Sequence, residues 1–308
     1  MGFGDEIMAA GEALRAQLRD PPSLYELPRT GPRPVAILDR RGKPRWHAVW
    51  EGNPRIVRPQ QVAAGLEVQR IVNGPGCRPY LLSESRERYV FNADYRAQPG
   101  EIWLNDAELA FAAGYAGGVV VEPFIKSTAS PNKNWGWARW QALVRLGLRR
   151  RPDLEWWQLG CDGPGPGTRW LDGVRPIVTA QGPGGFRQAC AVLAKAEAAV
   201  LPEGGLHHAA AALGVPAVVI FGGFIAPAIT GYGGHINLAA PHAGLAPRQS
   251  CGLRVPCRGC AETMAAVTPE EVAANLEALL CSSAKASGCR TVSGTWSGSC
   301  ATSAGTRP

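Results

Sequence analysis

Hydrophobic and polar positions alternate along the first part of the chain in a way that predicts strands and helices in turn. Residues 7–18 have helical spacing and no internal proline, and residues 106–115 are helix-like up to Gly117-Gly118. No strand precedes the first helix, so either the sequence starts late or this unit begins one strand short. Short apolar runs bounded by Pro and Gly predict strands at 34–39, 55–57, 80–82, 88–91 and 101–104.

A second series of the same kind starts at Val119. Apolar runs predict strands at 119–125, 154–159, 175–179, 198–201 and 217–221, and helices at 135–148, 186–196, 206–213 and from Thr268-Pro269 to about Leu280. This alternation predicts an α/β protein with two doubly wound, Rossmann-like domains facing each other across a cleft. We expect domains at 1–117 and 118–281, and a disordered, acid-free tail at 282–308.

Length and composition agree with two globular domains. The chain has 308 residues, 45% of them hydrophobic, and its 38 Gly and 26 Pro fall at the ends of apolar runs. The net charge of +7 includes three basic and no acidic side chains in the tail. The remaining excess suits a small anionic ligand or weak contact with an anionic membrane surface, and it argues against nucleic acid, which usually binds a concentrated basic face.

The sequence predicts a cytoplasmic protein. Residues 1–10 lack a basic start followed by an apolar core, so no signal peptide is expected. The uncharged stretch 209–232 is interrupted by glycines and prolines, which favours helix plus strand over a membrane span. With no export signal, the nine cysteines are expected to be reduced rather than paired in a disulfide framework.

The segment 198–223 is a predicted strand, a Gly-rich turn, an alanine-rich helix and a second strand. The backbone N–H groups at the start of such a helix lack intrahelical partners and carry a partial positive charge, which suits a phosphate. Glu203, Gly204, Gly205, His207 and His208 lie at this position. The alternative is an ordinary strand-to-helix corner in which the two histidines cap or pack.

Residues 203–216 resemble the C-terminal motif of the family 9 glycosyltransferases, the ADP-heptose:lipopolysaccharide heptosyltransferases and their relatives. The family pattern is Asp, Ser/Thr, Gly, two free positions and His, followed by alanines and a proline. When the two are aligned on Pro216, Gly205 and His208 match, whereas Glu203 replaces the Asp and Gly204 the Ser/Thr. The resemblance implies the GT-B fold and a nucleotide-sugar donor site here.

Two further stretches support this resemblance, which is clearest over 119–281. Gly4-Asp5 is similar to the N-terminal Gly-Asp motif, whose Asp is the proposed catalytic base. Lys133-Asn134-Trp135 is similar to the family's Lys-x-Trp signature, in a loop that contributes hydroxyls and a lysine to phosphate binding. The resemblance therefore implies that Asp5 is the base and that the donor phosphates are bound by Ser127, Thr128, Ser130 and Lys133.

Transfer with inversion needs a base near the acceptor hydroxyl and stabilisation of the departing nucleoside diphosphate. Asp5 could be the base, while Lys133 and the helix start at 204–208 could stabilise the leaving group without a metal; no Asp-x-Asp motif is present and no cofactor is expected. Alternatively, Asp5 caps the first helix and Lys133 is a solvated loop charge.

Cys251-x5-Cys257-x2-Cys260 is a separate cluster. With His235 or His242 it could form a structural zinc site, although half of the usual four-ligand pattern is missing. A structural loop, as in some relatives with Cys-rich segments here, is the alternative that we favour.

The sequence thus predicts a transferase that moves a sugar from a nucleoside-diphosphate donor to a hydroxyl group of a glycan or glycolipid, with no nucleic-acid partner and at most peripheral membrane contact. The rivals are an epimerase or hydrolase of nucleotide sugars with the same architecture, and a non-catalytic nucleotide-binding protein. The sugar, the nucleotide base, the acceptor and the true start of the chain stay open.

Overall fold

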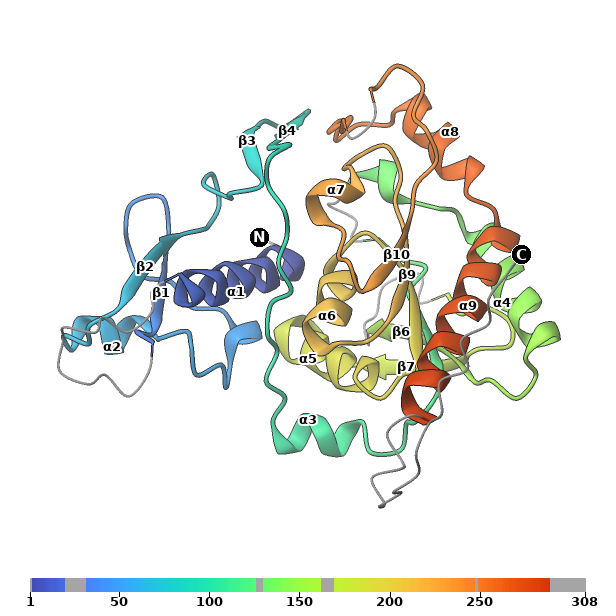
Figure 1. Cartoon of the computed structure of the whole chain (residues 1–308), viewed down its shortest axis with the longest axis horizontal. Coiled ribbons are helices and arrows are strands. Elements are labelled where there is room, and N and C mark those ends of the chain that lie inside the picture. Colours follow the sequence, from blue (N-terminus) through green and yellow to red (C-terminus); the bar gives the residue numbers. More distant parts are fainter. Residues whose placement is uncertain (1, 20–31, 126–129, 162–168, 247–248, 289–308) are drawn as a thin grey trace, which may run out of the picture.

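The computed structural model describes residues 2–19, 32–125, 130–161, 169–246 and 249–288 (Figure 1). The elements up to residue 118 are α1 (Phe3–Leu18), β1 (Val35–Leu38), η1 (Ala48–Trp50), α2 (Pro59–Ala63), β2 (Gln69–Val72), β3 (Leu81–Glu84), β4 (Tyr89–Phe91) and α3 (Asp106–Phe111). Those that follow are β5 (Val119–Val121), η2 (Pro131–Lys133), α4 (Trp137–Arg150), β6 (Trp156–Cys161), β7 (Arg175–Thr179), α5 (Gly182–Leu193), β8 (Ala198–Pro202), α6 (Gly205–Leu213), β9 (Ala217–Ile220), α7 (Pro227–Thr230), β10 (His235–Leu238), α8 (Arg258–Ala266) and α9 (Pro269–Gly288).

The largest sheet of the described residues has six strands in the order β10-β9-β8-β5-β6-β7, and every neighbouring pair is parallel. From β5 the chain moves outward through β6 to β7, then returns to β8 and moves outward the other way. The direction of strand order therefore reverses between β5 and β8. In doubly wound sheets ligands bind outside the carboxyl ends of the strands at such a reversal.

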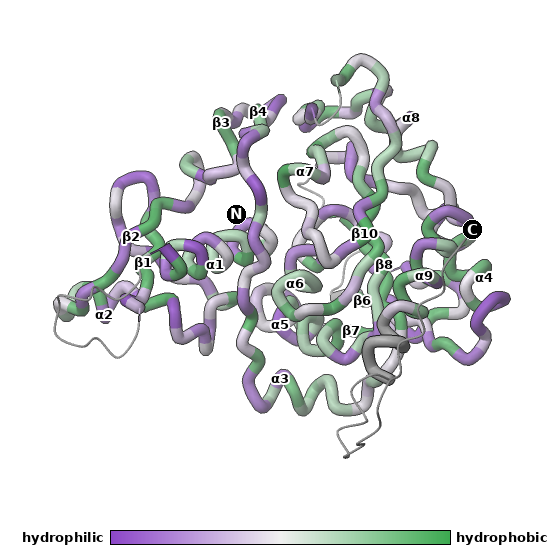
Figure 2. Tube along the Cα trace, in the orientation of Figure 1, coloured by the Kyte–Doolittle hydropathy of each residue, from purple (hydrophilic) through white to green (hydrophobic). Residues whose placement is uncertain are grey.

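Helices cover both faces of this sheet, which explains the continuous apolar runs of its strands. In β5, Val120 belongs to the core beneath α5 and α6, whereas Val119 and Val121 belong to the core beneath α4 and α9. The same alternation holds along β8 and β9, because successive side chains of a strand point to opposite faces. Hydrophobic residues accordingly gather on the strands and inner helices, and the peripheral loops are largely hydrophilic (Figure 2).

Helix α1 lies between the small parallel β1–β2 sheet and helices α5 and α6 (Figure 1). Its apolar residues, such as Ile7 and Ala13, join those of β1 and of the large sheet in one continuous core. The segment after β4 crosses α1 closely: a Cβ on Gly100 would lie 2.2 Å from the carbonyl oxygen of Ile7, and one on Gly11 would lie 2.4 Å from that of Gln98. This close packing holds α1 against the segment that follows β4.

Most predicted elements are confirmed within a few residues, and several are corrected. Residues 55–57 form only an isolated bridge from Ile56 to Val35, and 101–104 form no strand. The strand predicted over 119–125 ends at Val121, and the last helix continues to Gly288 rather than ending near Leu280. Strands β2 and β10 and helices α2, α7 and α8 were not predicted. The residues beyond 288 lie outside the described part.

In the residues that the structure describes, no helix combines the length and the apolar character that crossing a bilayer requires.

Candidate functional site

Two of the predicted donor-binding stretches meet at the point where the strand order reverses. Lys133 ends η2, in the connection that follows β5, and Glu203 comes directly after β8. Because β5 and β8 are hydrogen-bonded neighbours and parallel, both connections leave the sheet at the same edge. Residues 70 positions apart in the sequence are thereby brought into contact.

The Nζ of Lys133 forms an ion pair with the Oε2 of Glu203, and the Oε1 of Glu203 lies 3.7 Å from the Nε2 of His208. The side chain of Glu203 is only 7% exposed. Burial acts to raise the pKa of Glu203, but the positive charge of Lys133 and the nearby ring of His208 outweigh it and hold this pKa well below its usual range. Glu203 is therefore ionised at neutral pH and orients the lysine.

Helix α6 begins at Gly205 with Gly204 as its N-cap, and no side chain of the described residues caps it. The first intrahelical bond runs from the N–H of His208 to the carbonyl of Gly204. The preceding N–H groups, including those of Gly205 and Leu206, carry the positive end of the helix dipole. Since Gly204 has no side chain, nothing on it covers these donors.

The two adjacent histidines differ in surroundings. The Nδ1 of His208 lies 2.7 Å from the hydroxyl of Tyr232, and its Nε2 faces Glu203. His207 is fully buried against the rings of Phe221 and Tyr232, and neither of its ring nitrogens has a hydrogen-bond partner among the described residues. Burial lowers the pKa of His207 well below its ordinary value, so this ring is neutral and serves the core.

The N-terminus of α1 meets the N-terminus of α6. A Cβ on Gly4 would lie 2.5 Å from the Cδ2 of His208 and 3.5 Å from the Cα of Gly205, so only glycine allows this approach. Beside it, the ring of Phe3 stacks on that of Phe186 with centroids 4.2 Å apart. The positive ends of two helix dipoles thus converge, which makes the junction favourable for an anion.

Asp5 lies in the first turn of α1, next to this junction. Its Oδ2 accepts a hydrogen bond of 2.8 Å from the N–H of Gly2 and lies 3.4 Å from the guanidinium of Arg78, and its Oδ1 accepts a hydrogen bond from the hydroxyl of Tyr80. The N-cap of α1 is Gly2, not Asp5; Asp5 lies at the third helical position, and its bond from the N–H of Gly2 is one half of a capping box. Asp5 nevertheless remains 12% exposed.

The hydroxyl of Tyr80 donates a hydrogen bond to Asp5. Tyr80 is nearly buried, and burial together with the negative charge of Asp5 raises the pKa of Tyr80 well above its ordinary value, with a smaller contribution from Glu203. Tyr80 and Arg78 were not singled out in the sequence, because they follow no motif and contact Asp5 across 75 and 73 positions.

The remaining predicted donor residues are less informative. Ser127 and Thr128 lie outside the described residues. Ser130 is buried, and its hydroxyl donates a 2.8 Å hydrogen bond to the carbonyl of Leu253. In this conformation Ser130 fastens its loop to the cysteine-bearing segment instead of presenting a free donor.

The cysteine-bearing segment has its own cluster. His242, Cys251, Cys257 and Cys260 place their ligand atoms within 4.8 Å of one another, and His235 instead packs against His207. Glu203, His207 and His208 satisfy the same distance criterion, although the carboxylate there is already paired with Lys133.

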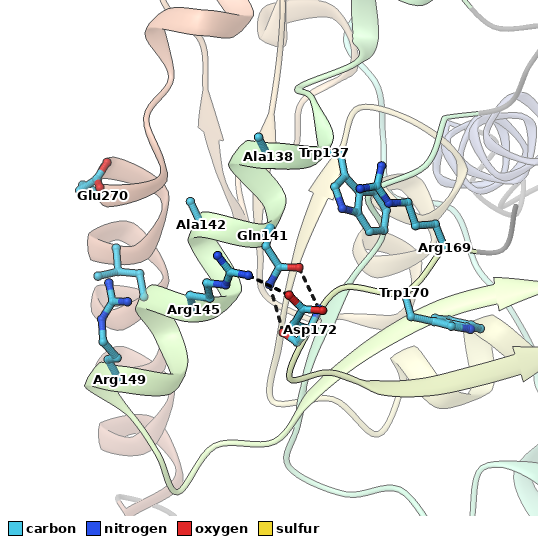
Figure 3. Close-up of a pocket in the computed structure, with 11 residues that line it drawn as sticks. Trp137, Ala138, Gln141, Ala142, Arg145, Arg149, Arg169, Trp170, Asp172 and Glu270 are labelled. Atoms are coloured by element: carbon cyan, nitrogen blue, oxygen red, sulfur yellow. Dashed lines mark hydrogen bonds and ion pairs between the residues drawn. The ribbon is translucent and has the colours of Figure 1, made fainter.

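A surface pocket of about 490 Å³ lies on another part of the molecule, between α4 and the segment before β7 (Figure 3). Arg169 lies over the ring of Trp137, and Arg145 is paired with Asp172. None of the predicted site residues lines this pocket. We therefore locate the candidate site at the edge of the sheet and not here.

Comparison with known proteins gives a match in structure alone. No protein-family model matches the chain, and neither does any curated protein sequence. A glycosyl transferase of family 9 from Veillonella parvula aligns with a TM-score of 0.57 at 13% identity, over 92% of this chain and 95% of that one.

Two other structures are similar over less of their length or at lower scores. The chain covers 54% of ADP-heptose lipopolysaccharide heptosyltransferase II from E. coli, with 59% of this chain aligned, 16% identity and a TM-score of 0.43. The iron-containing dodecameric glycosyltransferase TibC from E. coli aligns with a TM-score of 0.48 at 14% identity, over 81% of this chain and 76% of that one. The chain thus spans about half the length of the first of these. The mixed α/β architecture with its parallel sheet and the V. parvula match together show that this chain has the GT-B fold of the family 9 glycosyltransferases.

Proposed function

We propose that this protein is an inverting glycosyltransferase that moves a sugar from a nucleoside-diphosphate donor to a hydroxyl group of a glycan or glycolipid acceptor. The observation that carries the proposal is the convergence of α1 and α6, which brings the carboxylate of Asp5 beside an uncapped helix start and the Lys133–Glu203 pair. A base next to an anion-binding site is the arrangement that such a transfer requires.

The roles follow from position. Asp5 accepts the proton of the attacking hydroxyl. Its hydrogen bond with Tyr80 and its ion pair with Arg78 orient the carboxylate toward the junction of the two helices. The N–H groups at Gly204 and Gly205 and the ammonium of Lys133 stabilise the negative charge that grows on the departing diphosphate. The proposal assigns leaving-group stabilisation to these groups and no step to a divalent ion.

Glu203 and His208 complete the donor side of the site. Glu203 holds Lys133 in place, and His208 bridges Glu203 and Tyr232. Ser127, Thr128 and Ser130 belong to the same proposed phosphate-binding loop by their resemblance to the family. Residues 118–281 would then form the donor-binding domain and residues 1–117 the acceptor side, in a cytoplasmic enzyme.

The experiment is a transfer assay with Asp5→Asn. A panel of nucleotide sugars headed by ADP-heptose, chosen because of the family resemblance, is first screened by thermal shift for a donor that stabilises the native state. With that donor, Asp5→Asn is expected to lower kcat by about 10²- to 10⁴-fold while the donor Kd stays close to that of the native chain. Equal loss of binding and turnover would show that Asp5 is not the base.

A non-catalytic nucleotide-binding protein is the second candidate. It is favoured by the contacts of Asp5: the N–H of Gly2, the hydroxyl of Tyr80 and the guanidinium of Arg78 already occupy both carboxylate oxygens, which a base must offer to its substrate. Nucleotide binding without transfer, hydrolysis or epimerisation in the same screen would support this candidate. Release of free sugar or of an epimer from the donor alone would instead identify a hydrolase or an epimerase.

A further inference from the structure

His242, Cys251, Cys257 and Cys260 form a compact cluster between the loop that follows β10 and the start of α8. The Sγ atoms of Cys251 and Cys257 lie 3.6 Å apart, and the Nε2 of His242 lies 3.9 Å from the Sγ of Cys257 and 3.6 Å from that of Cys260. Cys251 and Cys260 are buried, and His242 and Cys257 are half-buried. All four ligand atoms lie within 4.8 Å of one another.

These separations fit a single tetrahedral metal ion. With metal–sulfur bonds of about 2.3 Å and metal–nitrogen bonds of about 2.05 Å, the corners of a tetrahedron are separated by about 3.8 Å between two sulfurs and by about 3.6 Å between sulfur and nitrogen. The three measured distances lie within a few tenths of an ångström of these values. A disulfide between Cys251 and Cys257 would require a sulfur–sulfur distance of about 2.05 Å.

The surroundings of His242 hold it as a ligand. Its Nδ1 lies 2.7 Å from the carbonyl oxygen of Ala243, so Nδ1 carries the proton and the lone pair of Nε2 points toward the thiols. The ring lies between two glycines: a Cβ on Gly223 would approach it to 2.0 Å and one on Gly259 to 2.4 Å. The imidazole thus occupies the space beside these two glycines, and any side chain at 223 or 259 would overlap the ring.

We propose that His242, Cys251, Cys257 and Cys260 bind one tetrahedrally coordinated transition-metal ion, Zn²⁺ or iron, as a structural site. Three thiolates and one imidazole are a donor set that both ions accept, and a closed set of four protein ligands leaves no open position for catalysis. The assignment is independent of the proposed transferase activity.

The ion would fix the loop that carries Lys133. Asn132, its neighbour in η2, accepts a 2.9 Å hydrogen bond from the N–H of Cys257 and donates bonds of 2.8 and 2.9 Å to the carbonyls of Leu253 and Val255. Metal binding at Cys257 thus holds the backbone to which Asn132 is attached. Loss of the ion is expected to loosen Lys133.

The same segment also contacts the β3–β4 hairpin. The N–H of Tyr89 donates to the carbonyl of Gly252, and the Nε of Arg88 donates to that of Cys251. The proposed ion therefore lies where three parts of the chain meet: the hairpin, the loop of η2 and the start of α8. An ion bound there would hold these three parts of the chain together.

The direct test is the metal content of the purified full chain, prepared without a histidine tag and measured by inductively coupled plasma mass spectrometry. One zinc or one iron per chain is expected, and the element found distinguishes the two ions. Replacing the ion with Co²⁺ should give the intense visible bands of tetrahedral cobalt and the near-ultraviolet charge-transfer bands of cobalt–thiolate bonds. The cobalt measurement uses the native chain and does not depend on any variant folding.

Variants separate this site from adventitious binding. Cys257→Ser and His242→Gln should each reduce the bound metal to near background, and a chelator should lower the Tm of the native chain but not of these variants. Cys281→Ser, which removes an exposed thiol away from the cluster, should keep the full metal content. A metal-free native chain that takes up no Zn²⁺, Fe²⁺ or Co²⁺, or a Cys251–Cys257 disulfide found by mass spectrometry, would overturn the proposal.

Discussion

The ammonium of Lys133 is paired with the carboxylate of Glu203 across the carboxyl ends of β5 and β8. Both side chains are largely shielded from water, at 19% and 7% exposure. Such a pair is informative because removing one partner leaves the other charge buried without compensation. The contact also joins the two stretches that the family resemblance assigned to the donor.

Lys133→Ala is therefore expected to lower the free energy of unfolding by about 3 kcal/mol, measured by urea denaturation at pH 7. The double variant Lys133→Ala/Glu203→Gln should lose less than the single variant, because no uncompensated charge is left. Additive losses from Lys133→Ala and Glu203→Gln would show that the pair is not coupled. Donor binding should fall in both Lys133 variants, since both lack the ammonium.

Gly4→Ala tests the approach of the two helices. The new methyl would meet the ring of His208, so the helix starts must move apart; overpacking of this kind costs about 1–3 kcal/mol. The thermal stabilisation given by the donor found in the nucleotide-sugar screen should be reduced as well, because the anion site is formed by both helices.

The matched control is Gly184→Ala. Gly184 also lies in the first turn of a helix, α5, and a Cβ there would meet no heavy atom within 4 Å. This change is expected to raise stability by about 0.4–1 kcal/mol through the unfolded state. Equal effects of the two substitutions would contradict the close approach at Gly4.

The sequence predicted five of the six strands of the large sheet, all but β10, because the information for them is local. The strands β5, β8 and β9 are continuous apolar runs with a Gly or Pro at their end or within two residues of it, and burial on both faces requires such runs. Strand β2 was missed because Gln69–Val72 alternates between half-buried and exposed positions and contains two polar residues. The stretch 101–104 looked equally strand-like, but no described strand pairs with it.

Much of the candidate site could not be predicted from local sequence patterns, because its contacts join residues that are far apart in the sequence. Motif positions indicated Asp5, Lys133, Glu203 and His208, and the topology brings them to one edge of the sheet; their roles stay predictions. Tyr80 contacts Asp5 only because the hairpin region folds back on α1, and no spacing rule encodes that contact. Likewise, the three cysteines were visible in the sequence, whereas the choice of His242 over His235 depended on the loop after β10.

Arg187 and Glu108 form a buried ion pair that joins α5 to α3, with the Nη2 of Arg187 2.8 Å from the Oε2 of Glu108. Arg187 also donates to the backbone carbonyls of Val49 and Trp103. Arg187→Ala should therefore lower the free energy of unfolding by about 3–5 kcal/mol, because it leaves a buried carboxylate and two carbonyls without their donor.

The control for this variant is Arg145→Ala. Arg145 forms an ion pair of similar length with Asp172, but the two side chains are 59% and 76% exposed. The expected change is therefore below about 1 kcal/mol. Urea denaturation of both variants in the same buffer measures the difference. A comparable decrease in the free energy of unfolding for Arg145→Ala would mean that burial does not determine how much these ion pairs contribute to stability.

His207 should make the stability of the protein depend on pH. Its folded pKa is lowered by burial, whereas in the unfolded chain the ring titrates near its ordinary value of 6.5. The stabilising effect of the neutral, buried ring is fully present above that value. As pH falls below 6.5 the unfolded chain takes up a proton that the folded chain does not, so stability decreases by up to about 1.4 kcal/mol per pH unit.

His207→Phe removes the titrating ring and keeps an aromatic group against Phe221 and Tyr232. The variant should lose less stability than the native chain between pH 7 and pH 5, in a series of urea denaturations. Some pH dependence should remain, because burial also lowers the pKa of His235 to about 4. Identical pH profiles for the two proteins would mean that His207 is not held neutral in the folded state, and that its burial between Phe221 and Tyr232 does not exclude the proton.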